Sequence, residues 1–225
     1  MKYTWIFFDA DETLFHFDAF KGLALMFSRN GVEFTQEDFA AYQKVNKSLW
    51  VDYQNGTIDA DKLKNTRFEA WSKKLNISTQ VLNQDFLTAM ADICSPLSGA
   101  KDLLDSLYGK VKLGIITNGF TALQEIRLQR TGFTDYFDAV VISEQVGTAK
   151  PDKAIFEYAL KEAGQPNKEQ VLMVGDNPDS DVLGGLNAGI ETCWLNSDHR
   201  ESPDNIQAHY QVNSLMELQR LLHQK

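Results

Sequence analysis

Short runs of β-branched and aromatic residues recur along the chain, and successive positions within each run are apolar instead of alternating. Such runs are typical of strands buried on both faces of a parallel sheet. The five runs are Thr4–Asp9, Val111–Thr117, Ala139–Ser143, Val171–Gly175 and Ile190–Leu195. Helical patterns follow three of them, at Phe120–Thr131, Asp152–Ala163 and Pro178–Ala188. This alternation predicts an α/β fold with a doubly wound parallel sheet.

The first predicted strand is separated from the second by roughly a hundred residues, far more than one crossover helix needs. Four helical patterns fill this interval, at Phe17–Asn30, Thr35–Asn55, Asp59–Leu75 and Ser78–Ile93. Thr35 and Asp38 form a capping-box pattern, and Ser78 is a predicted N-cap. We therefore expect an all-helical cap, residues 15–95, inserted into an α/β core of residues 1–14 and 96–225.

Composition and charge limit the partners of this chain. Of 225 residues, 43% are apolar, which is enough for a buried core. There are 22 basic and 31 acidic residues, for a net charge of −9, and no basic stripe follows the sequence. Binding to long nucleic acid is therefore disfavoured. A small anionic substrate stays possible, because a bound cation and one lysine can reverse the local sign.

Other features indicate the cellular setting. Cys94 and Cys193 are far apart and in no metal-binding or redox spacing, which suits a reducing compartment. No apolar stretch approaches the length of a membrane span or a signal-peptide core. We expect a cytoplasmic protein without a membrane partner. The sequence leaves a monomer and a homodimer equally open.

The strongest chemical signal is an acidic pair, Asp9 and Asp11, where the first predicted strand ends. In open α/β sheets, ligands bind at the carboxyl ends of the strands. Two carboxylates so close together repel each other unless a cation neutralises them. A solvated acidic turn is the alternative interpretation of this segment alone.

Thr117, Asn118 and Gly119 end the second predicted strand and precede a helix. A hydroxyl and backbone N–H groups at such a position can hold phosphate oxygens. The same three residue types are also common in turns and helix caps. Their place at the predicted ligand edge favours phosphate binding.

Lys150 precedes Pro151, which is predicted to start a helix. A lysine in this position can be ordinary solvated surface. The functional interpretation is an ammonium group that pairs with Asp9 and with a phosphate in a cleft of low dielectric constant.

The fourth predicted strand ends in Gly175 and Asp176, followed by Asp179 and Asp181. Helix capping accounts for Asp179. Asp176 is placed like Asp9, directly at a strand end, and is the better candidate for a metal ligand. Asp181 is expected to act on the metal through water or through another ligand.

Together these four segments resemble the haloacid dehalogenase superfamily, with its Asp-x-Asp-x-Thr, Thr/Ser strand end, Lys and Gly-Asp-x-x-x-x-Asp motifs. The resemblance implies a Rossmann-like core with a helical cap of the first type, and neighbouring strands that carry Asp9, Thr117 and Asp176. A closer likeness is to pyrimidine 5′-nucleotidases of enterobacterial type. It is carried by Trp5–Phe15, Leu49–Gly56 and Thr192–Asn196.

The resemblance implies a phosphomonoester hydrolase that acts through an aspartyl phosphate on Asp9, most closely a nucleoside 5′-monophosphate phosphatase. Asp11 would protonate the leaving oxygen and then activate water. Mg²⁺, for which Mn²⁺ or another divalent cation can substitute, would be held by Asp9, Asp176 and the main-chain carbonyl of Asp11. Thr117 and Lys150 would bind the remaining phosphoryl oxygens.

Other functions stay open. Asp11 argues against carbon–halogen chemistry, because dehalogenases of the superfamily lack an aspartate there. A phosphatase of another small metabolite, or a phosphomutase, shares the acidic pair. A receiver-like signalling domain also uses a phosphorylated aspartate, a threonine and a lysine, but receivers are shorter and lack a cap.

Substrate choice is expected to depend on the cap. Asn46, Trp50 and Tyr53 follow a spacing that places them on one helix face. We expect Trp50 to stack on a base and Asn46 to contact it. The alternative is that Trp50 and Tyr53 pack inside the cap.

Overall fold

The structure is a computed structural model, and it describes residues 2–224. The chain forms two compact units, and each is described by itself. Unit 1 comprises Met1–His16, Ser95–Gly119 and Leu128–Lys225, and unit 2 comprises Phe17–Cys94 and Phe120–Arg127. The second part of unit 2 was expected in the core. The domain boundaries inferred from the sequence stay a prediction.

Unit 1 contains a six-stranded sheet in the order β3-β2-β1-β4-β5-β6, and all its strand pairs are parallel. The strands are β1 (Trp5–Phe8), β2 (Lys112–Thr117), β3 (Ala139–Ile142), β4 (Val171–Gly175), β5 (Glu191–Leu195) and β6 (Tyr210–Val212). The strands extend from β1 to one side through β2 and β3 and then to the other side through β4, β5 and β6, and this change of side defines a doubly wound sheet. The predicted fold class is confirmed.

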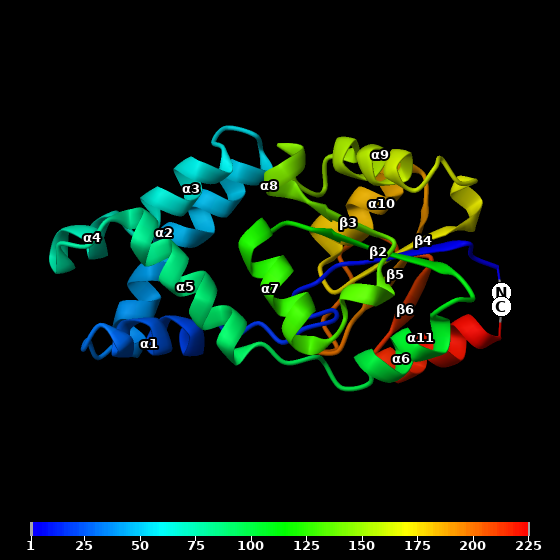
Figure 1. Cartoon of the computed structure of the whole chain (residues 1–225). Coiled ribbons are helices and arrows are strands. Elements are labelled where there is room, and N and C mark those ends of the chain that lie inside the picture. Colours follow the sequence, from blue (N-terminus) through cyan, green and yellow to red (C-terminus); the bar gives the residue numbers. More distant parts are fainter. Residues whose placement is uncertain (1, 225) are drawn as a thin grey trace. The chain divides into compact units, whose positions relative to one another are not determined.

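Helices cover both faces of this sheet (Figure 1), with α9 and α10 on one side and α6 and α11 on the other. The helical elements of unit 1 are α6 (Ala100–Leu107), α8 (Ser143–Val146), α9 (Lys153–Glu162), α10 (Leu183–Ala188), α11 (Leu215–His223), the 3₁₀ turns Thr134–Tyr136 and Lys168–Gln170, and a π-helical turn at Pro178–Val182. Because both faces are covered, the central strands β1 and β4 are buried along their whole length, as their continuous apolar runs predict.

The centre of the sheet is packed tightly by aromatic side chains. Every residue of β1 is buried, and the Trp5 and Phe7 rings stack with their centroids 5.3 Å apart. The Phe7 ring lies against Gly114 of β2, where a Cβ atom would overlap it. A glycine at this position therefore lets β1 and β2 pair while keeping the large ring in the core.

Unit 2 is helical. Its helices are α1 (Ala19–Arg29), α2 (Gln36–Gln54), α3 (Ala60–Thr66), α4 (Glu69–Leu75) and α5 (Thr79–Ile93), together with the first turns of α7 (Thr121–Thr131). The predicted capping box is present, because Thr35 and Asp38 exchange side-chain and backbone hydrogen bonds. Ser78 caps α5 as predicted. A cluster of rings that includes Phe27, with its centroid 4.2 Å from that of Trp71, forms the interior.

The prediction of one helix over Asp59–Leu75 is wrong. The Phe68 N–H donates to the carbonyl of Asn65 instead of continuing the α-helical pattern, which ends α3 and starts α4. The break buries both Arg67 and Phe68 against α5, which one continuous helix would not do as readily.

Some elements were not predicted. α6 has apolar residues at helical spacing, at Ala100, Leu103, Leu104 and Leu107, and all four are buried. β6 has only three residues at the sheet edge, too short to give a pattern. Pro151 lies before α9 and its N-cap Asp152, so it does not start that helix as predicted. Among the described residues, no helix is long and apolar enough to span a membrane.

Candidate active site

The three central strands bring the predicted chemical residues to one edge of the sheet. β1 is paired with β2 on one side and with β4 on the other, as the family resemblance implied. Asp9 follows β1, Thr117 ends β2, and Asp176 follows β4. Because the carboxyl ends of parallel strands share an edge, residues distant in the sequence meet here.

Asp9 is held in a fixed position at this edge. Its N–H donates to the carbonyl of Val174 at 2.8 Å, and it is 8% exposed. The following turn folds back, with the N–H of Phe15 donating to the Ala10 carbonyl and the N–H of Glu12 to the Phe15 carbonyl. Asp11 lies in this turn and is half-buried. The rigid strand end therefore presents the Asp9 carboxylate while the turn carries Asp11.

Lys150 is the electrostatic centre of the site. Its Nζ lies 2.5 Å from Asp9 Oδ1 and 2.7 Å from Asp181 Oδ1, and it also donates to the carbonyl of Ile116 at 2.6 Å. The side chain is only 1% exposed. Although burial opposes its charge, the two carboxylates raise the pKa of Lys150 above its ordinary value. All three ammonium protons have acceptors, so a bound phosphate must take over one of these positions.

Three carboxylates form a compact cluster. Asp9, Asp176 and Asp181 each offer one oxygen, and these oxygens lie within 4.8 Å of one another. Asp181 Oδ1 also accepts from Ser180, and its Oδ2 accepts from the N–H of Asn177. An all-oxygen donor set of this kind suits a hard divalent cation.

A glycine makes room for the most deeply buried of these carboxylates. At Gly175, the last residue of β4, a Cβ atom would overlap the Asp181 carboxylate. Any larger residue at that position would therefore displace Asp181 from the cluster.

The cluster is electrostatically strained when no cation is bound. Burial, together with the Asp181 and Asp9 carboxylates, raises the pKa of Asp176 to about 8. Burial likewise raises the pKa of Asp181 to about 6, although the Lys150 ammonium opposes this change. Lys150 contacts only two of the three carboxylates, and the third, Asp176, is half-buried and keeps a raised pKa, so the cluster favours an added positive charge.

Two residues predicted to bind substrate are engaged within the protein. Asn118 forms a reciprocal pair with the backbone of Lys150, donating to its carbonyl at 2.9 Å and accepting from its N–H at 2.7 Å. The Gly119 N–H donates to the hydroxyl of Ser143 at 3.2 Å. The Asn118 side chain thus positions Lys150, and no sequence pattern indicates the role of Ser143.

Arg200 is a site residue that the sequence analysis missed. Its guanidinium donates to the main-chain carbonyl of Asp176, and its Nη2 lies 3.6 Å from Asp176 Oδ2. The indole N–H of Trp194 donates to the same carbonyl at 2.9 Å. Asn196 holds the Arg200 backbone through two hydrogen bonds, as Asn118 holds Lys150. Arg200 lies in a loop without a periodic pattern, so only the structure reveals it.

The two predicted cap residues lie in unit 2, on α2. Trp50 is half-buried, with its ring centroid 5.6 Å from those of Tyr53 and Phe120. Asn46 is also half-buried, and its Oδ1 accepts a hydrogen bond from the Tyr42 hydroxyl. Tyr53 is buried, as the packing alternative expects, whereas Trp50 keeps part of its surface exposed.

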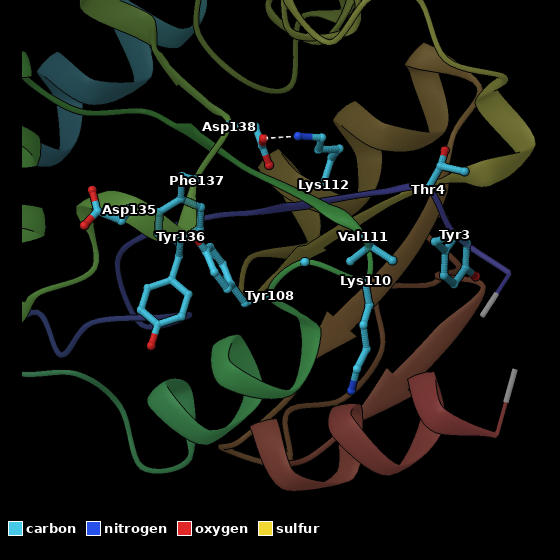
Figure 2. Close-up of a pocket in the computed structure, with 11 residues that line it drawn as sticks. Tyr3, Thr4, Tyr108, Lys110, Val111, Lys112, Asp135, Tyr136, Phe137 and Asp138 are labelled. Carbon is cyan, nitrogen blue, oxygen red and sulfur yellow. Dashed lines mark hydrogen bonds and ion pairs between the residues drawn. The ribbon is translucent and has the colours of Figure 1, made fainter.

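A separate hollow of about 590 Å³ lies at the opposite edge of the sheet, where β1 and β2 begin (Figure 2). It is lined by Tyr108 and Tyr136, whose rings meet edge to face, and by charged residues that include two lysines with partners. Lys112 pairs with Asp138, and Lys110 donates to the Ser106 carbonyl. The carboxylate cluster follows β1 and β4 at the other ends of the strands, so this hollow has no part in it.

The doubly wound sheet brings three carboxylates and one buried lysine together at the carboxyl ends of its central strands, an arrangement that suits an enzyme acting on an anionic ligand. The model of the haloacid dehalogenase-like hydrolases matches residues 3–189. The chain belongs to this family, and the family prediction is confirmed.

Individual relatives match the chain over nearly its whole length. It is 59% identical to the pyrimidine 5′-nucleotidase YjjG of Escherichia coli over 99% of both chains. It is 38% identical to the pyrimidine 5′-nucleotidase PynA of Streptococcus pneumoniae, covering 97% of this chain and 94% of PynA. A crystal structure of the HAD-hydrolase YfnB from Bacillus subtilis, bound to magnesium, superposes with a TM-score of 0.83 at 31% identity over 98% of both chains.

Proposed function

We propose that the chain hydrolyses pyrimidine nucleoside 5′-monophosphates in a reaction that requires Mg²⁺. The observation that carries the chemistry is the cluster of Asp9, Asp176 and Asp181 around Lys150 at one sheet edge. The substrate class is supported by the 59% identity to a pyrimidine 5′-nucleotidase over almost the full length of both proteins. Fold alone would not distinguish among phosphate esters.

The metal would be held by the carboxylates of Asp9 and Asp176 and by the main-chain carbonyl of Asp11, with Asp181 orienting the cluster. The raised pKa of Asp176 supports this assignment, because it reflects burial and neighbouring negative charge, and a bound cation would offset both. When bound, Mg²⁺ supplies positive charge for the phosphoryl oxygens. Mn²⁺ or another divalent cation of similar chemistry could replace it.

Asp9 performs the first chemical step. One of its carboxylate oxygens attacks phosphorus, the ester P–O bond breaks, and its electron pair leaves with the nucleoside oxygen. Asp11 donates a proton to that oxygen. In the second step Asp11 accepts a proton from water as the water oxygen attacks phosphorus, which releases inorganic phosphate and regenerates the Asp9 carboxylate.

Other residues hold the substrate. The Thr117 hydroxyl donates a hydrogen bond to a phosphoryl oxygen. Lys150 Nζ gives up one of its present acceptors, such as the Ile116 carbonyl, and donates to another phosphoryl oxygen instead. Asn118 acts mainly on Lys150, because its side chain is paired with the Lys150 backbone. Because Gly119 has no side chain, its backbone leaves space for the phosphate beside it. In the cap, Trp50 stacks on the base and Asn46 offers it a polar contact.

A phosphatase of another small metabolite is the main alternative, since the core residues would be the same. A phosphomutase would return the phosphoryl group to a second substrate oxygen instead of to water. The test must therefore measure the release of inorganic phosphate in water, without any added acceptor for the phosphoryl group.

The experiment is a screen of phosphate release from nucleoside monophosphates, sugar phosphates and an aryl phosphate, with Mg²⁺ and with EDTA. We expect pyrimidine nucleotides to give the largest kcat/KM, and EDTA to abolish turnover. Asp9→Asn should lower kcat by at least about 10⁴-fold, as expected for losing a nucleophile. Asp204→Asn, a change at an exposed loop residue, is the matched control. Activity of Asp9→Asn within tenfold of wild type would contradict the mechanism.

A further inference from the structure

Unit 2 buries a cation without a carboxylate partner. Arg67 is 6% exposed, and its guanidinium carbon lies 5.2, 5.1 and 5.0 Å from the ring centroids of Phe68, Phe86 and Phe120. Its Nη2 donates to the side-chain oxygen of Asn83, and the guanidinium also interacts with the Tyr42 side chain. Among the residues that the structure describes, no ion pair of Arg67 with an acidic side chain is found. A buried charge so placed is costly unless a ligand adds to its interactions.

The buried polar atoms of this unit that have no hydrogen-bond partner include two side-chain nitrogen donors of residues that contact Phe120. Within the described part of the chain, Arg67 Nε and Gln124 Nε2 have no hydrogen-bond partner. Gln124 is 1% exposed, and its side-chain oxygen accepts from the Nε of Arg127 at 2.7 Å. That bond fixes the orientation of the amide and leaves its N–H₂ group unused. Buried donors without acceptors are rare in native proteins and call for an explanation such as a ligand.

Phe120 joins these donors to an aromatic surface. Its ring is 5.6 Å from Trp50 and 5.0 Å from the Arg67 guanidinium carbon, measured to the ring centroid. Its carbonyl accepts from the N–H of Gln124, one helical turn further on. Phe120 directly follows Gly119 in the sequence. Phe120, which contacts both Arg67 and Trp50, is therefore covalently linked to the segment that we propose to hold phosphate.

We propose that Arg67 and Gln124 determine specificity by donating hydrogen bonds to acceptor atoms on the edge of the substrate base, while Phe120 and Trp50 pack against the ring. This inference rests on the proposed function. A pyrimidine ring presents a carbonyl oxygen together with a further carbonyl or ring-nitrogen acceptor, which two donors can satisfy at once. A sugar phosphate without a base offers neither the ring nor those acceptors, so it gains nothing from this group.

Gln124→Glu tests the proposal with little change in shape. The carboxylate keeps an acceptor for Arg127 but replaces the unused N–H₂ group with an oxygen that repels a base carbonyl. We expect the ratio of kcat/KM for uridine 5′-monophosphate to kcat/KM for ribose 5-phosphate to fall at least tenfold. Binding of uridine, which carries no phosphate, should weaken in parallel in calorimetry. Gln129→Glu, at an exposed position of the same helix, should leave the ratio unchanged.

Arg67→Lys is the second variant, because it keeps a positive charge but loses the Nε donor and the planar guanidinium. In this variant the ratio of kcat/KM for uridine 5′-monophosphate to kcat/KM for ribose 5-phosphate should also fall. If Gln124→Glu fails to fold, Arg67→Lys alone tests the proposal. A ratio within twofold of wild type in a folded variant, with normal uridine binding, would overturn the inference while leaving the proposed function intact. Failure of the wild-type protein to release phosphate from any nucleotide would instead overturn the proposed function.

Discussion

Lys150 in unit 1 and Arg67 in unit 2 are both buried cations, and their surroundings differ sharply. In unit 1, Lys150 contacts the carboxylates of Asp9 and Asp181 and a main-chain carbonyl, so each of its protons has an acceptor. In unit 2, Arg67 lies among aromatic rings, contacts a neutral amide, and retains a donor without an acceptor. Both side chains are almost completely buried.

The difference indicates what each cation contributes. Lys150 compensates carboxylates that belong to the protein, so its charge is already used in the absence of substrate. Arg67 has no carboxylate partner and is compensated by ring faces, the Asn83 amide and the Tyr42 side chain, so its Nε donor is left for a ligand. The first arrangement supports chemistry that is common to many phosphate esters, and the second supports discrimination between them.

The largest effect is expected for Lys150→Met. Removal of the ammonium leaves Asp9 and Asp181 buried without their counter-charge, and breaking a buried ion pair typically costs about 3–5 kcal/mol. In EDTA, the free energy of unfolding should fall by an amount of that order. With Mg²⁺, kcat/KM should fall by at least about 10²-fold for all substrates, as for loss of a preorganised donor.

The control for this variant is Lys153→Met, which removes an exposed lysine at the start of α9. It should change neither quantity appreciably. If Lys150→Met unfolded at the same denaturant concentration as this control, the carboxylates would not depend on Lys150, and the contrast with Arg67 would disappear.

Changes in pH and in Mg²⁺ concentration should reveal the carboxylate charge that Lys150 leaves uncompensated. Burial and the neighbouring carboxylates raise the pKa of Asp176 from 3.8 to about 8. Because the folded state binds this proton more tightly than the unfolded state, its contribution is fully present below about pH 4 and is lost as the pH rises through about 8. In EDTA, the Tm of wild type relative to Asp176→Asn should therefore fall from about pH 5 to about pH 8.5.

Mg²⁺ should oppose that loss, and more strongly at the higher pH, where the carboxylates are ionised and free to bind it. Thermal unfolding with and without the metal at both pH values checks this. An equal effect of Mg²⁺ on the Tm of wild type and of Asp176→Asn would contradict the assignment of Asp176 to the cation site.

Much of the core could be predicted because its signals are local. A strand buried on both faces gives a continuous apolar run, and a carboxylate directly after such a run must lie at the ligand edge of a parallel sheet. Asp9 and Asp176 are recognisable for this reason. Arg200 is not, because its contact with the Asp176 carbonyl depends on a loop held by Asn196 and has no periodic pattern.

The group around Arg67 could not be predicted for a different reason. A single helical pattern covers Asp59–Leu75, and it gives no indication that the chain breaks at Phe68 and turns Arg67 inward. The meeting of α2, the end of α3 and the start of α7 around Phe120 is a long-range event. Sequence spacing identifies Trp50 on one face of its helix, but it does not identify the partners of that face.

A smaller effect on folding is expected for Arg67→Met. Methionine can fill the space among the rings and carries no charge to desolvate, so loss of the Asn83 contact is offset. The free energy of unfolding should change by less than about 1.5 kcal/mol. The nucleotide-to-sugar-phosphate ratio of kcat/KM should nevertheless fall about 10- to 100-fold, as for a lost hydrogen bond to a charged group. A loss of stability as large as that of Lys150→Met would make Arg67 a structural residue.

The smallest effect is expected for Trp50→Ala. Stacking of a base on an aromatic side chain is worth about 1–3 kcal/mol, so kcat/KM for nucleotides should fall by roughly tenfold or more. Hydrolysis of a small aryl phosphate should fall less, because its ring is attached directly to the phosphate oxygen and does not extend as far. Kinetics on both substrates, with the Tm of the variant, distinguish two roles for this half-buried ring. Equal losses on both substrates with a lowered Tm would show that Trp50 packs the cap against Tyr53 and Phe120, and that base recognition depends on Arg67 and Gln124 without it.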